Sequence, residues 1–79
     1  MITKVWLHYF LGRIATKYTD FFLKFLDDLE LDSRQKIIML ARYRDKKSWK
    51  EIPDIKGVNC ELQNVMKIHK QVIDKIIKL

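Results

Sequence analysis

Three polar side chains lie close together on one predicted helix near the C-terminal end of the chain. Gln63, Asn64 and Lys67 fall within its first two turns. The amides of Gln and Asn can pair bidentately with adenine, and the Lys ammonium can donate to guanine acceptors. In helix-turn-helix proteins the N-terminal residues of the second helix enter the major groove of DNA. These three residues are therefore the candidate base contacts.

Lysines precede this predicted helix and also lie on it, where they could bind the phosphate backbone of double-stranded DNA. Residues 1–33 hold four Lys/Arg and five Asp/Glu, a net charge of −1, whereas residues 34–79 hold twelve and five, a net charge of +7. This asymmetry indicates that the two parts face different partners and that the basic part faces a polyanion. The alternative is that the lysines only keep the helices soluble. The candidate phosphate contacts are Lys46, Lys47, Lys50, Lys56 and Lys70.

The chain shows no pattern that is typical of an enzyme or of a metal or cofactor site. We find no Ser/His/Asp or Cys/His arrangement, no glycine-rich phosphate loop and no paired catalytic carboxylates. His69 is expected to be a packed histidine with one hydrogen bond, since no second histidine or carboxylate has a suitable spacing. Cys60 is either a reactive thiol or an ordinary small residue, and the second is preferred. Trp49 is expected to anchor the core rather than to stack on a base.

Composition favours a small all-α protein in the cytoplasm. With 79 residues the chain allows one domain, and two glycines and one proline favour long helices over β-structure. A single cysteine excludes an internal disulfide and fits a reducing compartment. No stretch approaches the roughly 20 apolar residues that a membrane span needs. We therefore expect no membrane partner.

The N-terminal part predicts one long helix over residues 4–30, irregular near Gly12. Apolar residues recur there every three or four positions, and polar residues occupy the opposite face. Most of this face should be core, but part of it could pair with a second copy or another partner. Trp6, Tyr9 and Phe10 fit either interpretation. The dimer or partner candidates are Leu7, Leu11, Ile14, Tyr18, Phe21 and Phe25.

The remainder predicts a helix-turn-helix module over residues 32–79. Asp32 and Gln35 resemble a capping box that starts a buried helix ending near Arg44. Ser48 begins a second capping box and a short helix, which Pro53 bends or ends. A glycine turn follows, and Asn59 caps a last helix over residues 60–78. Together with the N-terminal helix over residues 1–31, this predicts a four-helix domain.

Two segments of this module carry a distinctive pattern of residues. Its positions are Arg42, Tyr43, Asp45, Ser48, Trp49, Glu51 and Ile52, then Val65, Ile68, His69, Val72, Ile73 and Lys75. With these residues, the stretch of about residues 30–79 resembles region 4 of bacterial sigma factors, and it is most similar to the ArpU/RinA type of late-gene transcription regulator from Gram-positive phages. The resemblance implies a DNA-binding module that acts on transcription.

Two departures from this pattern leave a second hypothesis open. The stretch from Ile52 to Val65 is longer than in compact members, and Pro53 stands where a small residue is usual. Either change could re-aim the recognition helix or abolish DNA binding. The alternative is a phage-type interaction module that binds a host protein, such as RNA polymerase, through the aromatic N-terminal helix.

Overall fold

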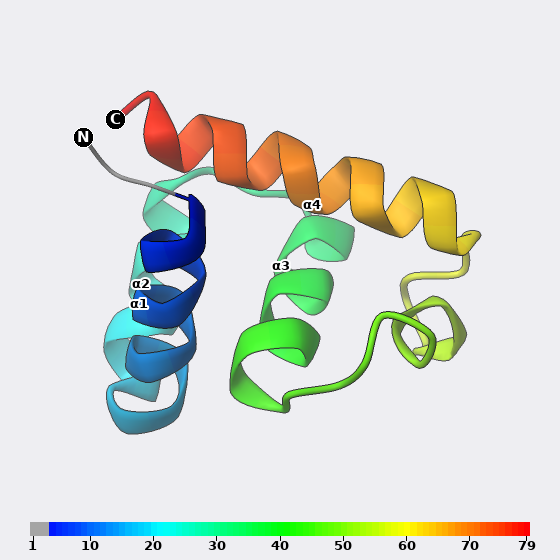
Figure 1. The fold of residues 1–79 in the computed structure, drawn as a ribbon, viewed down its shortest axis with the longest axis horizontal. Helices are drawn as coiled ribbons and strands as arrows, with labels where there is room; N and C mark the ends of the chain where they lie inside the picture. Colours follow the sequence, from blue (N-terminus) through cyan, green and yellow to red (C-terminus); the bar gives the residue numbers. More distant parts are fainter. Residues whose placement is uncertain (1–3) are drawn as a thin grey trace.

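The computed structural model describes residues 4–79 and shows an all-α domain, as the composition predicts (Figure 1). Residues 1–3, the start of the predicted N-terminal segment 1–31, lie outside the residues that the structure describes. No strand occurs within residues 4–79. The elements are α1 (Lys4–Lys17), α2 (Thr19–Asp28), α3 (Ser33–Met39), the π-helix η1 (Leu40–Arg44), the 3₁₀-helix η2 (Ile52–Asp54) and α4 (Leu62–Ile77).

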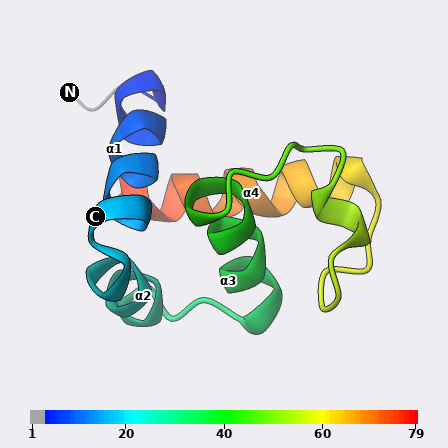
Figure 2. The ribbon, with the colours of Figure 1, turned by 90° about the horizontal axis from the view of Figure 1, so that it is seen from below.

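The N-terminal segment forms two helices, so the prediction of one long helix over residues 4–30 is wrong. The break lies at Tyr18, whose φ of −130° and ψ of 57° leave the helical region, and not near Gly12. The Thr19 hydroxyl donates to the Ala15 carbonyl at 2.9 Å, and α2 begins at Thr19. Figures 1 and 2 both show α2 lying beside α1. Gly12 lies inside the regular part of α1.

This break changes which aromatic residues are buried. The side chains of Leu7, Leu11 and Ile14 are buried as the spacing predicts, and they are therefore covered by this chain itself. Beyond the break the buried face moves by one residue, to Phe22 and then to Leu26 and Leu29. Tyr18 and Phe21 are left 63% and 59% exposed, and Phe25 is partly buried. Among the six dimer candidates, only Tyr18 and Phe21 remain well exposed.

Two clusters of buried side chains hold the helices together, and α4 belongs to both of them. The first cluster joins α1, α2, the α3–η1 segment and the C-terminal half of α4 through residues that include Leu11, Phe22, Met39 and Val72. The second cluster joins α3, η2 and the N-terminal half of α4. Its buried members are Ile38, Ala41, Ile52, Val58 and Val65.

The start of α3 is formed as predicted. The Gln35 N–H donates to Asp32 Oδ1 at 2.8 Å, and the Asp32 N–H donates to Gln35 Oε1 at 2.9 Å, which completes the capping box. The segment remains helical to Arg44, also as expected. Its last turn widens into η1, where the Asp45 N–H donates to the Leu40 carbonyl at 3.0 Å.

The predicted short helix after Ser48 is replaced by a turn and the single 3₁₀ turn η2. The Glu51 N–H donates to the Ser48 carbonyl, and the Ser48 hydroxyl donates to Glu51 Oε1. Because the hydroxyl caps no backbone group, this second capping box is wrong. Pro53 is the second residue of η2 and does not end a longer helix. The start of a helix suits a residue that lacks an N–H, because the first N–H groups have no partner within the helix.

The connection between η2 and α4 contains two left-handed residues. Gly57 has a φ of 97°, and a Cβ at this position would lie 2.6 Å from Ile37 Cδ1. Asn59 has a φ of 46° and does not cap the helix, so that prediction is wrong. Glu61 stands at the N-cap position without a side-chain cap, and α4 begins at Leu62. Cys60 therefore precedes the helix.

Candidate functional site

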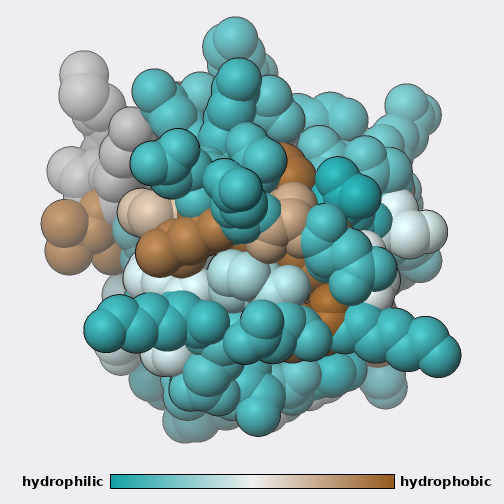
Figure 3. Space-filling view, turned by 90° about the vertical axis from the view of Figure 1, so that its right-hand side faces the viewer, coloured by the Kyte–Doolittle hydropathy of each residue, from teal (hydrophilic) through white to brown (hydrophobic). Residues whose placement is uncertain are grey.

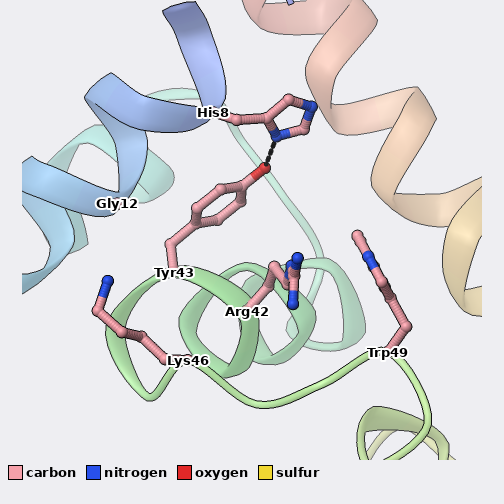
Figure 4. Close-up of a pocket in the computed structure, with 6 residues that line it drawn as sticks. All are labelled: His8, Gly12, Arg42, Tyr43, Lys46 and Trp49. Atoms are coloured by element: carbon pink, nitrogen blue, oxygen red, sulfur yellow. Dashed lines mark hydrogen bonds between the residues drawn. The ribbon is translucent and has the colours of Figure 1, made fainter. Parts of the chain in front are cut away.

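Two histidines and a tyrosine form a hydrogen-bonded chain where α1, η1 and α4 meet. The Tyr43 hydroxyl lies 2.6 Å from His8 Nδ1 and 2.6 Å from His69 Nε2. Figure 4 shows the first of these bonds, from His8 on α1 to Tyr43 on η1. The two imidazoles also stack, with ring centroids 5.4 Å apart.

Burial keeps Tyr43 and His69 uncharged at physiological pH. It lowers the pKa of His69 from 6.5 to about 4, and the nearby His8 and Arg42 add to the effect. Burial also raises the pKa of Tyr43 well above its ordinary value of 10. With one hydroxyl proton, Tyr43 donates to one imidazole and accepts an N–H from the other. The hydrogen bond between Tyr43 and His69 therefore joins two uncharged groups.

Arg42 is held against Trp49 beside this chain. Its guanidinium carbon lies 4.6 Å from the centroid of the Trp49 ring, and Nη1 donates to the Lys47 carbonyl at 3.0 Å. Trp49 also meets His69 edge to face, with centroids 4.8 Å apart. Trp49 packs on the second cluster, as expected of a core anchor.

A cavity of about 440 Å³ opens between α1 and the end of η1 (Figure 4). Its lining residues come from α1, from η1 and from the connection that follows. Lys46, with a φ of 55°, extends toward α1, and its Nζ lies 3.9 Å from the place a Cβ on Gly12 would take. The cavity is lined by His8, Gly12, Arg42, Tyr43, Lys46 and Trp49.

Two neighbouring hollows share residues with this cavity. One, of about 460 Å³, is lined by His8 from α1 and by α4 residues that include Gln63, Lys67, His69 and Lys70. The other, of about 310 Å³, shares His8, Gly12 and Lys46 with the cavity. We call the three together the basic groove. Its lining, within the described residues, contains no Asp or Glu and six cations: Arg13, Lys17, Arg42, Lys46, Lys67 and Lys70.

The predicted base contacts are exposed on α4, but they do not all face this groove. Gln63 and Lys67 line it, whereas Asn64 is exposed outside it. Figure 3 shows one side of the molecule, on which hydrophilic residues cover most of the surface around a narrow hydrophobic band.

The predicted phosphate contacts are also exposed and are divided in the same way. Lys46 and Lys70 line the groove. Lys50 and Lys56 do not line it, and Lys47 is 3.8 Å from Glu51 Oε2. These lysines therefore do not form one continuous patch.

The contribution of α1 is not predicted from the sequence. The near-neutral charge of the N-terminal part indicates a separate partner, yet His8, Arg13 and Lys17 complete the basic groove. No spacing pattern pairs His69 with a second histidine, because His8 lies 61 positions away along the chain. The available signal was that both histidines adjoin an apolar helix face, where a polar ring needs a partner.

A second exposed feature lies on α1. Val5, Trp6, Tyr9 and Phe10 are exposed to differing degrees, and the rings of Trp6 and Phe10 stack with centroids 5.1 Å apart. Exposed aromatic residues clustered in this way are typical of interaction surfaces. We call these four residues, the three aromatic ones and the adjacent Val5, the aromatic row.

Comparison with protein-family models, with curated proteins and with solved structures finds no match to this chain. Among the described helices, none has the length and apolar character needed to cross a membrane. Residues 4–79 also contain no group of three or more His, Cys, Asp or Glu side chains arranged to hold a metal ion.

Proposed function

We propose that this protein binds double-stranded DNA and acts as a transcription regulator. The observation that carries the proposal is the basic groove, in which six cations from α1, η1, the following connection and α4 meet without a carboxylate in the lining. Lys and Arg side chains gathered in this way attract the phosphate backbone. The net charge of +6 on a chain of 79 residues adds to the attraction.

The packing of α4 also supports this proposal. Val65 holds the N-terminal half of α4 on the second cluster, against α3 and η2, while Gln63 and Lys67 remain exposed. This is the role of the second helix in a helix-turn-helix, and it agrees with the resemblance to sigma region 4. On the other side of the groove the cations come from α1, through Arg13 and Lys17.

Affinity measured against salt concentration tests DNA binding. We expect the logarithm of the affinity to fall linearly with the logarithm of the salt concentration. The variants Lys67→Gln and Lys70→Gln should each lower the magnitude of this slope by about 1, because each removes one phosphate contact. Lys24→Gln is the matched control, because it removes an exposed charge on α2 outside the groove. Absence of duplex binding at low salt would reject the proposal.

The aromatic row favours a second candidate function, binding to a host protein such as RNA polymerase. Truncating a hot-spot aromatic side chain at the centre of an interface costs about 2 kcal/mol or more, which is about 30-fold in affinity. In a titration with purified bacterial RNA polymerase, Tyr9→Ala should weaken binding by that amount, and Lys67→Gln should not. Equal binding by wild type and Tyr9→Ala would contradict this candidate.

A further inference from the structure

The cavity of Figure 4 has a chemical character that differs from the rest of the basic groove. In the groove's other two hollows the cations belong to α1, to α4 or to exposed Lys46. This cavity is lined by the half-buried Arg42 and the exposed Lys46, on either side of Tyr43, and by the Trp49 ring. Such a volume, about 440 Å³, accommodates an anionic group together with part of the molecule that carries it.

Arg42 is fixed in place before any ligand binds. Its stacking on Trp49 and its bond to the Lys47 carbonyl restrict the side chain, so little conformational entropy remains to be lost. A guanidinium has five N–H donors, of which the bond to Lys47 uses one. Its planar fork matches the oxygens of a phosphate group.

Lys46 is the second cation, and its backbone is strained. A φ of 55° in a residue with a side chain costs of the order of 1 kcal/mol, and such strain concentrates at functional sites. Gly12 lines the side of the cavity that α1 forms, where an added Cβ would make ordinary contact with Lys46 Nζ at 3.9 Å. A side chain much larger than that of alanine would therefore enter the cavity.

No carboxylate neutralises these two cations in the described structure. Neither Arg42 nor Lys46 takes part in the ion pairs found among residues 4–79. Asp45 lies between them in sequence, but its Oδ1 accepts from Arg44 Nε at 2.9 Å and it does not line the cavity. Burial is the main cause of the lowered pKa of His69, and the positive charge of Arg42 adds to it.

We propose that this cavity binds a phosphate group, held by the Arg42 guanidinium and the Lys46 ammonium. The group is either a backbone phosphate of nucleic acid or the phosphate of a small organic monoester, since both present the same oxygens. The site does not depend on the DNA-binding proposal, because a free phosphate suffices to test it.

Fluorescence of Trp49 is the natural readout. In a Trp6→Phe background, Trp49 is the only tryptophan, and a phosphate that pairs with Arg42 changes the surroundings of its ring. Inorganic phosphate titrated against chloride at constant ionic strength should give a saturable response. Arg42→Lys should weaken it at least about tenfold, because an ammonium lacks the planar fork and the stacked position.

Gly12 provides a steric test that leaves every charge unchanged. Gly12→Leu should abolish the saturable response by filling the cavity, and Gly12→Ala should stay within about twofold of the parent, because its Cβ makes only ordinary contact with Lys46. Both substitutions favour helix formation in α1, and circular dichroism verifies the fold. Lys24→Gln, remote from the cavity, is the control for net charge.

Two further titrations identify the source of the phosphate. If it is backbone phosphate, a short DNA duplex changes the Trp49 signal and Arg42→Lys weakens the duplex and free phosphate alike. If it is a small monoester, thymidine 5′-monophosphate binds and the duplex leaves the signal unchanged. Either result supports the cavity, and the second shows that this cavity does not hold the DNA backbone, while the affinity measurement against salt still decides the DNA-binding proposal.

The cavity proposal is overturned by any of three results. In the first, chloride changes the Trp49 fluorescence as phosphate does. In the second, Gly12→Leu still shows the saturable change with phosphate. In the third, the protein binds the duplex, but neither phosphate nor thymidine monophosphate changes the Trp49 fluorescence. The last result would leave the DNA-binding proposal standing.

Discussion

At the scale of single residues, the Tyr43 hydroxyl connects elements that are distant in the sequence. It bonds to His8 on α1 and to His69 on α4 from a position on η1. A buried polar group without a partner costs about 1–3 kcal/mol, and the described residues contain no such buried side-chain atom. The three side chains therefore satisfy one another where the helices meet.

The stability of the fold should depend on pH through His69. Its pKa is about 4 in the folded protein against 6.5 for an unperturbed imidazole, so the unfolded state binds more protons between these values. Stability is therefore unaffected by this group above about pH 7 and falls as the pH drops toward 4, by up to about 3 kcal/mol. Urea denaturation at several pH values measures the free energy of unfolding.

His69→Gln is the matched variant for this experiment, because a side-chain amide can either accept from or donate to the Tyr43 hydroxyl but does not titrate. We expect the difference in stability between wild type and variant to change with pH in the window from 7 to 4. Parallel pH profiles for the two proteins would contradict the prediction.

The environment of His69 could be predicted in part from the sequence. That His69 is a packed histidine with a hydrogen bond followed from its place in an apolar stripe, and the structure confirms it. The partner and its own link to His8 depend on how α1 crosses η1 and α4. No local pattern encodes that crossing, so His8, Arg42 and the cavity were not predicted.

At the scale of elements, the capping signals were reliable only where the backbone could satisfy them. The capping box at Asp32 is confirmed because a full helix follows it, with donors for the carboxylate to accept. The same pattern at Ser48 precedes Pro53, and only one 3₁₀ turn forms. A proline without an N–H removes the bond that would continue an α-helix.

The break at Tyr18 could not be placed from spacing alone. The predicted apolar seam continued through Tyr18, Phe21 and Phe25, and an equally apolar alternative one residue along contains Phe22, Leu26 and Leu29. Folding α2 back beside α1 buries the second set. Tertiary packing therefore decided between two faces that the sequence made nearly equivalent.

At the scale of the whole molecule, α4 joins the two clusters into one unit. Because both clusters include α4 residues, loss of the first cluster should also release the second. The basic groove lies across the same junction, with cations from both ends of the chain. The charge asymmetry along the sequence therefore does not divide the molecule into two independent surfaces.

Unfolding should consequently be a single transition. Leu11→Ala, in the first cluster, should lower the free energy of unfolding by about 2–5 kcal/mol, because it leaves a cavity among fully buried side chains. In the Trp6→Phe background, the fluorescence of Trp49, which packs on the second cluster, should change at the same urea concentration as circular dichroism. Val5→Ala, at an exposed position, should change stability by less than about 0.5 kcal/mol.

Separate midpoints for the two signals in Leu11→Ala would show that the clusters unfold independently. Coincident midpoints that shift together would confirm one cooperative unit.

The close approach of Gly57 to Ile37 has a consequence for how this fold can diversify. A methyl group added at Gly57 meets Ile37 Cδ1 at 2.6 Å and is strained by the φ of 97° as well. Because Cδ1 is the far end of a flexible side chain, Ile37 can turn aside, and the left-handed backbone is the obstacle that remains. Descendants of this chain should therefore keep glycine at position 57 for as long as they keep this connection into α4.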